Sequence, residues 1–104
     1  MHRGVNFAAK FDAMRKGGQS EVIVRTGGVA VRLVCVEGGG DGRWDKHDAT
    51  PETVVVWSGD FNIEFRDATV RLSPGQCCVI PAGVEHRGTS TAGAEVILFT
   101  NLKV

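Results

Sequence analysis

The stretch TVVVWSGDFNIEFRDATVRLSPGQCCVI, residues 53–80, decides the fold class, because turn residues divide it into short β-rich runs. The turn signals stand at 58–60, 67–68 and 74–75, an interval typical of antiparallel strands. In FNIEFR, residues 61–66, apolar and polar residues alternate, which predicts a strand that turns Phe61, Ile63 and Phe65 inward. The pattern predicts an all-β fold, a small antiparallel sandwich or barrel.

The flanking segments extend this pattern in both directions. Upstream, SEVIVR (20–25) and VAVRLVCVE (29–37) are separated by Gly27-Gly28, a pairing typical of a tight hairpin. Downstream, a turn at 81–83 precedes a last strand, AEVILFTN, at 94–101. Near the start, Asn6 can cap one short helix with apolar residues at helical spacing, and glycines supply its end: Phe7, Phe11, Met14, Gly17 and Gly18. We expect a helix or arm at about 5–17 and a barrel at about 21–104.

Residues Val54 to Trp57 are apolar on both strand faces, so something must cover the outer one. A second sheet from a homodimer is the preferred cover, and the N-terminal helix is the alternative. Trp44 and Trp57 are out of phase with the polar residues discussed below, which predicts a role in packing or in an interface.

Length and charge restrict the function classes. With 104 residues and 11.1 kDa, the chain is expected to form one domain, 1–104. Twelve basic residues balance twelve acidic ones, so the chain has no net positive electrostatic field that would attract nucleic acid or an anionic membrane. Small molecules or copies of the chain are the favoured partners. The first residues lack an apolar signal core and no run approaches a membrane span, so we expect a soluble, cytoplasmic protein. Three cysteines form no disulfide framework.

One polar segment, WDKHDATPE at 44–52, stands out as a candidate site. Asp45 and His47 lie two apart and would share one strand face, and a turn would bring Glu52 alongside. These residues are three potential ligands in one small volume. Scattered surface polar residues are the alternative interpretation.

These residues fall within two motifs that resemble those of the cupin superfamily, in particular small single-domain bacterial cupins. The first family motif, Gly-x5-His-x-His-x3–4-Glu-x6-Gly, matches in spacing with Asp45 in place of the first His, and its positions here are Gly39, Asp45, His47, Glu52 and Gly59. The second, Gly-x5-Pro-x-Gly-x2-His-x3-Asn, matches with Ser90 in place of the Asn, and its positions here are Gly75, Pro81, Gly83, His86 and Ser90. The resemblance therefore spans residues 39–90.

The resemblance implies a jelly-roll barrel that binds one divalent metal through His47, Glu52 and His86. Asp45 takes the fourth ligand position only by substitution, so it would ligate through a shifted backbone, through a water, or not at all. Two imidazoles and two carboxylates favour iron, manganese or zinc. The substrate wall would come from the inward apolar residues of 54–65, with Arg32 or Cys35, and Arg87 would be an anchor for a carboxylate.

These features favour a metal-dependent enzyme acting on a small organic molecule, with isomerase, oxygenase and lyase types all open. The alternative is a non-catalytic cupin module that binds or senses a small molecule or metal. A third interpretation is a dimeric scaffold in which the Val54–Trp57 surface matters more than the pocket.

Overall fold

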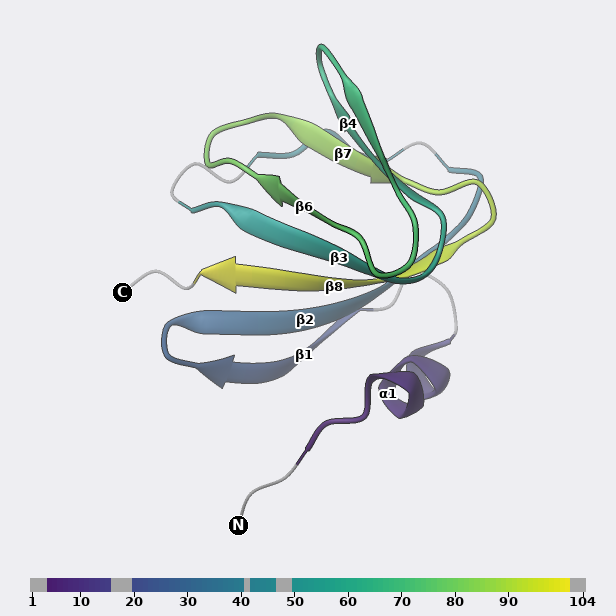
Figure 1. Ribbon diagram of the computed structural model, residues 1–104, viewed down its shortest axis with the longest axis vertical. Helices are drawn as coiled ribbons and strands as arrows, with labels where there is room; N and C mark the ends of the chain where they lie inside the picture. Colours follow the sequence, from purple (N-terminus) through teal and green to yellow (C-terminus); the bar gives the residue numbers. More distant parts are fainter. Residues whose placement is uncertain (1–3, 16–19, 41, 47–49, 102–104) are drawn as a thin grey trace.

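Two antiparallel sheets make up most of the chain in the computed structural model, which describes residues 4–15, 20–40, 42–46 and 50–101 (Figure 1). The elements are α1 Phe7–Met14, β1 Ser20–Thr26, β2 Val29–Val36, β3 Glu52–Gly59, β4 Phe61–Phe65, β5 Thr69–Leu72, β6 Cys77–Ile80, β7 His86–Thr89 and β8 Ala94–Asn101. One sheet has the strand order β1-β2-β8-β3-β6, and the other has the order β5-β4-β7. The predicted all-β jelly-roll fold with one short helix is confirmed.

The interior between the sheets is filled by side chains from both of them. Along β3 the buried positions alternate, so Glu52, Val54 and Val56 face inward. β4 contributes Phe61 and Ile63, as the alternation in FNIEFR predicted. Burying one such apolar side chain stabilises the fold by about 1.5–3 kcal/mol. One cluster therefore joins the two sheets: Val54, Val56, Phe61, Ile63, Leu72, Ile80, Ala94 and Val96.

Glycines stand where the backbone turns most sharply. Gly27 and Gly28 have φ values of 57° and 79°, the left-handed pair that a two-residue hairpin between β1 and β2 requires. Gly59, with φ of 81°, ends β3 before the chain enters β4 in the other sheet. The hairpin predicted at 27–28 and the turn predicted at 58–60 are therefore confirmed.

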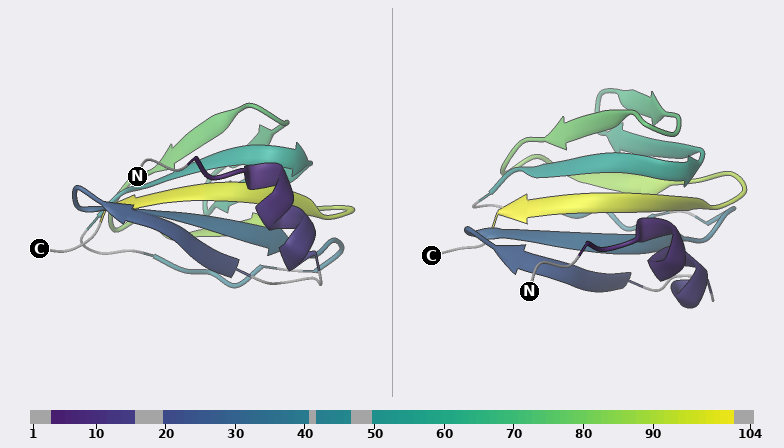
Figure 2. Two further views of the ribbon diagram at one scale, coloured as in Figure 1. Left: turned by 90° about the horizontal axis from the view of Figure 1, so that it is seen from below. Right: turned by 60° about the horizontal axis from the view of Figure 1, so that its bottom comes forward.

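Helix α1 packs on the side of the five-stranded sheet that faces away from the three-stranded sheet (Figure 2). Asn6 caps it as predicted, because its Oδ1 accepts a hydrogen bond of 2.9 Å from the Ala9 amide. Phe11 and Met14 are buried against Leu33 of β2 and its neighbours. Gly17 and Gly18, the predicted end of the helix, lie outside the described residues. Within the described ranges no helix is long and apolar enough to cross a membrane.

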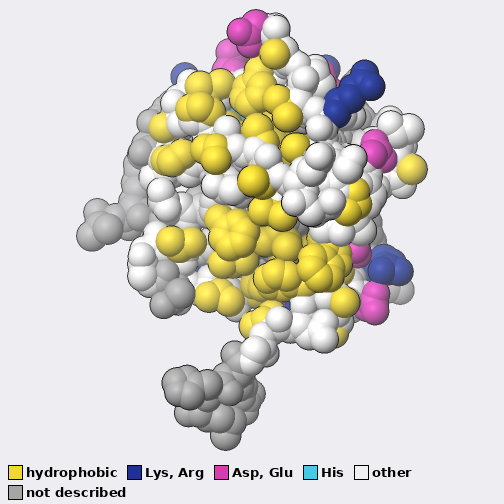
Figure 3. Space-filling model, in the orientation of Figure 1, with side chains coloured by type: hydrophobic (Ala, Val, Ile, Leu, Met, Phe, Trp, Pro, Cys, Tyr) yellow, Lys and Arg dark blue, Asp and Glu magenta, His cyan; other side chains and the backbone are white. Residues whose placement is uncertain are grey.

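The helix covers only part of the outer face of the five-stranded sheet. Val55 packs against the helix cluster, and the Trp57 ring lies 5.7 Å from that of Phe7 between centroids. Trp57, Val79 and Phe99 nevertheless stay 43%, 56% and 38% exposed. Figure 3 shows hydrophobic side chains gathered on this face, over β3 and β8. The alternative cover, the helix, is therefore present, and the homodimer stays a prediction.

The sequence pattern did not predict strand β7, because His86 was interpreted only as a motif residue after a turn. Its sequence, HRGT, contains little that favours a strand. Pairing with β4 determines its conformation, with Gly88 directly opposite Ile63. A Cβ at Gly88 would lie 2.4 Å from Cζ of Phe61, so glycine is needed here to let an inward aromatic ring approach the strand.

Candidate functional site

Glu52 and His86 lie at the same end of the interior, one on each sheet. Each is the first residue of its strand, and in Figure 1 β3 and β7 begin toward the same side of the molecule. His86 is directly opposite the inward residue Phe65, and opposed residues of an antiparallel pair project to one face. Both polar side chains are buried, each 8% exposed. Two ionisable groups thus face the interior at one end of an otherwise apolar core.

Asp45 joins this end through the backbone. Its amide donates to the His86 carbonyl at 2.9 Å, and the His86 amide donates to the Asp45 carbonyl at 2.9 Å. This isolated antiparallel bridge places the two residues directly opposite each other, so their side chains leave the same face. The Asp45 side chain is exposed, and its Oδ1 accepts a hydrogen bond of 2.8 Å from the Lys46 amide. The structure therefore brings Asp45 beside His86, at the rim of the interior.

The His86 ring is fixed by its own chain. Nδ1 lies 3.1 Å from the Val84 carbonyl oxygen, which can only accept a hydrogen bond. Nδ1 therefore carries the proton, and Nε2 carries the lone pair in the neutral ring. A histidine whose second nitrogen is held by a backbone carbonyl is the arrangement typical of metal ligands.

Glu52 is oriented by the neighbouring strand β8. Thr100 is its direct partner, and the Thr100 hydroxyl donates to Glu52 Oε2 at 3.1 Å. Thr100 is not predicted from the sequence as part of the site. Alternation in AEVILFTN gives it the same phase as the inward residues Val96 and Leu98, but nothing in the sequence says that β8 lies beside β3.

His47 lies outside the described residues, so its position relative to the other three candidates is not tested. Within residues 4–15, 20–40, 42–46 and 50–101, no group of three His, Cys, Asp or Glu side chains is close enough to hold a metal ion. The donor types at this end, an imidazole and two carboxylates, nevertheless fit a divalent ion. A complete site would need His47.

Two residues expected to line the pocket lie on different faces. Arg32 is opposite Leu98, which packs against the interior cluster, and its Nη1 donates to Ser20 Oγ at 3.1 Å. Cys35 instead packs beneath α1 with Phe11 and Ile97, where burial raises the pKa of its thiol. The expectation that Cys35 lines the interior was wrong, because its strand is apolar on both faces and the sequence does not distinguish them.

Arg87 was also misassigned. It follows His86 on β7 and therefore faces outward, where its Nη2 and Nε contact Glu64 Oε1 at 3.0 and 3.2 Å. The hydrogen bonds from Arg87 and then Thr89 hold the pKa of Glu64 below its ordinary value. The Arg87 side chain is 26% exposed and lies on the outer face, so it cannot anchor a substrate in the interior.

Trp44, next to Asp45, contacts two guanidinium groups on this outer face. Cζ of Arg66 lies 3.8 Å from the indole centroid, and Cζ of Arg87 lies 4.9 Å away. Such cation–π contacts are worth about 0.5–1 kcal/mol each at exposed sites. These contacts hold the residue before Asp45 against the three-stranded sheet, which agrees with the packing role predicted for Trp44.

Comparisons with known proteins agree with this architecture. The family described as the cupin domain matches residues 32–100. A cupin-2 domain protein from Shewanella frigidimarina is 31% identical with a TM-score of 0.85, covering 93% of each chain. A protein from Neisseria meningitidis is 26% identical with a TM-score of 0.86, over 95% of this chain and 99% of that one. A structure described as DMSP lyases is 25% identical with a TM-score of 0.64, over 70% and 38%. Among curated proteins nothing matches.

Proposed function

Because this chain belongs to the cupin family, we propose that it binds one divalent metal ion at the end of the interior where Glu52 and His86 are buried and Asp45 lies at the rim, and that it acts there on a small organic molecule. The observation that carries the proposal is the backbone pairing of Asp45 with His86 at the end where Glu52 is buried facing inward. Buried ionisable groups need polar partners, and Thr100 and the Val84 carbonyl hold Glu52 and His86 in place at this end of the interior.

The residues that would hold the metal are Asp45, His47, Glu52 and His86. Two carboxylates and two neutral imidazoles balance a divalent charge and suit iron, manganese or zinc. A bound metal would supply a Lewis acid for a carbonyl or enolate oxygen. The chain itself holds His86 in the tautomer with the lone pair on Nε2, through Val84, and orients Glu52 through Thr100.

Asp45 is the candidate general base of this proposal. Its carboxylate is exposed at the rim, and its Oδ1 accepts a hydrogen bond from the Lys46 amide. If His47, Glu52 and His86 hold the metal, Asp45 is the carboxylate left to accept a proton from a substrate. The likeness to a structure described as DMSP lyases supports an enzyme, without assigning that substrate to this chain.

Metal analysis tests the first step of the proposal. Protein purified without chelators, or incubated with iron(II), manganese or zinc and then desalted, is expected to retain about one equivalent of metal per chain. Inductively coupled plasma mass spectrometry gives the stoichiometry, and circular dichroism confirms that the β fold is intact. A folded protein that retains none of these ions would contradict the proposal.

A non-catalytic binding or sensing module is the second candidate. It is favoured by Asp45, which replaces the first histidine of the family motif. The Oδ1 of Asp45 accepts a hydrogen bond from the amide of the next residue, Lys46. Thermal shifts caused by small-molecule ligands, with no turnover of those ligands, would support it. Product formation that is lost in a His47→Ala variant would exclude it.

We further propose that a second copy of the chain covers the exposed apolar residues Trp57, Val79 and Phe99. The chain has no net charge, so two identical faces meet without overall repulsion. Light scattering should give the mass of a dimer, and Phe99→Glu should give a monomer because it buries a charge in the interface. Arg71→Glu, an exposed position on β5, should leave the dimer intact. A wild-type monomer at micromolar concentration would overturn this.

A further inference from the structure

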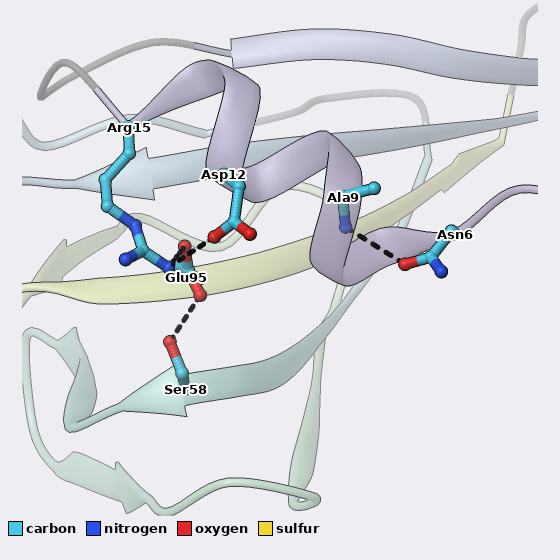
Figure 4. Close-up of polar contacts among 6 residues, drawn as sticks. All are labelled: Asn6, Ala9, Asp12, Arg15, Ser58 and Glu95. Atoms are coloured by element: carbon cyan, nitrogen blue, oxygen red, sulfur yellow. Dashed lines mark hydrogen bonds and ion pairs between the residues drawn. The ribbon is translucent and has the colours of Figure 1, made fainter.

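A second cluster of polar groups lies on the outer face of the five-stranded sheet, beneath the C-terminal end of α1 (Figure 4). Cys35, Glu95 and Ser58 stand in one row across β2, β8 and β3, because Cys35 and Ser58 are the two direct partners of Glu95. Together with Arg15 and the 92–94 backbone they line a pocket of about 290 Å³. This row faces away from the interior that holds the proposed metal site.

A β-bulge places Ser58 in this row. Val54 and Val56 face the interior, so regular alternation would turn Ser58 inward as well. The register of β3 against β8 shifts between Val56 and Ser58, and this shift sets Ser58 opposite the outward residue Glu95. Bulges commonly re-aim a side chain beside a binding site. Here the result is a hydrogen bond of 2.7 Å from the Ser58 hydroxyl to Glu95 Oε1.

The other oxygen of Glu95 lacks a donor. Oε2 is buried and has no hydrogen-bond partner among the residues the structure describes. Among the described residues, the cation that pairs with this oxygen is Arg15, whose Nη2 lies 3.6 Å away, too far for a hydrogen bond. The same Nη2 lies only 2.8 Å from Asp12 Oδ1. A buried carboxylate oxygen without a donor is destabilising, so this atom favours any ligand that supplies one.

The charges and walls of the pocket limit the ligand. Among the described residues, Glu95 and Asp12 carry two negative charges and Arg15 one positive charge, which leaves one negative charge in excess. A divalent metal is a poor fit, because Glu95 is the only carboxylate in the lining and the raised pKa of Cys35 keeps its thiol protonated. The remaining lining, from Val36, Ala92, Gly93 and Ala94, carries no charged side chain. It leaves room for a short alkyl group.

We propose that this pocket binds a small primary ammonium compound, whose N–H groups donate to Glu95 Oε2 and to the Ser58 hydroxyl oxygen. Ser58 uses its proton on Glu95 Oε1, so the lone pairs of its oxygen remain to accept. The ammonium charge balances the excess negative charge, and a charge-assisted hydrogen bond to a buried oxygen is stronger than a neutral one. The alkyl group lies against the uncharged part of the lining.

Titration of the full chain with propylammonium chloride tests the proposal, with the amide signals of Ser58 and Glu95 followed by NMR. Propylammonium is expected to bind saturably. Tetramethylammonium, which has the charge but no N–H, and 1-propanol, which has no charge, should bind at least about tenfold more weakly. Signals that do not shift, or equal affinities for the three compounds, would overturn the proposal, because water would then satisfy Glu95 Oε2 as well as an ammonium group does.

A Glu95→Gln variant gives the matched comparison. It keeps the shape of the side chain but removes the charge, so propylammonium affinity should fall about tenfold. Glu64→Gln removes a carboxylate on the opposite sheet and should leave the affinity unchanged. Equal losses in both variants would show a nonspecific charge effect and refute the site. Metal content should be the same in wild type and Glu95→Gln, so this test and that of the proposed metal site fail independently.

Discussion

A His86→Ala variant should lose metal affinity by about 100-fold or more and keep its fold. His86 is 8% exposed at the start of β7 and is the one imidazole at this end of the interior that the described residues include. Its ring presents the Nε2 lone pair because Nδ1 donates to the Val84 carbonyl. Alanine removes that lone pair, and no neighbouring residue on β7 can replace it because Arg87 faces outward to Glu64.

The control is Arg87→Ala on the same strand. It breaks an ion pair whose side chains are each 26% exposed and one of the two contacts to Trp44, so the loss of stability should be small. The metal affinity should change by less than about threefold, because the side chain lies on the opposite face from His86. Isothermal titration with zinc or manganese measures both variants. If His86→Ala bound metal like the wild type, the site would lie elsewhere.

The interior of the fold could be predicted because its signals are local. Alternation in FNIEFR identified the inward face of β4, and Gly27-Gly28 identified a hairpin whose left-handed φ values few other residues adopt. Asn6 capped the helix as expected, because an N-cap is a contact between residues three apart. The proposed metal-ligand set follows from the resemblance to the cupin motifs and stays a prediction, because motif spacing says which residues belong together but not where their side chains point.

The features that could not be predicted from the sequence depend on which strands become neighbours. Thr100 orients Glu52 across a gap of 48 residues, and the sequence does not state that pairing. β7 forms because β4 offers it an edge, although its residues do not favour a strand. Cys35 was placed on the wrong face because VAVRLVCV is apolar on both sides. Arg87 was a different kind of error, since alternation from His86 already predicted that it faces outward.

A Gly59→Ala variant should lower the free energy of unfolding by about 3–5 kcal/mol. Two separate penalties contribute to this loss. Gly59 has a φ of 81°, a conformation that costs a residue with a Cβ about 1–2 kcal/mol. In addition, a Cβ would lie 2.3 Å from the Gly93 carbonyl oxygen and 2.9 Å from Ala94 Cα, and both are backbone atoms that cannot rotate away.

Gly75→Ala separates the two penalties. Gly75 has a similar φ of 87°, but a Cβ there would meet nothing within 4 Å. Its loss should therefore be only the conformational part, about 1–2 kcal/mol. Urea denaturation of both variants, followed by circular dichroism, gives the two values. Equal losses would show that the approach of Gly59 to Gly93 does not determine the cost.

The Gly59 substitution should also affect the proposed metal site, although the residue lies at the other end of β3 from Glu52. Gly59 pairs with Ala94 of β8, and the same strand pairing sets Glu52 opposite Thr100. If alanine shifts β3 along β8, Glu52 loses that hydrogen bond and metal affinity falls together with stability. If the turn moves instead and the pairing is kept, stability falls while affinity stays unchanged. The two measurements on one variant therefore show whether the close contact with Gly93 determines the strand register or only the path of the turn.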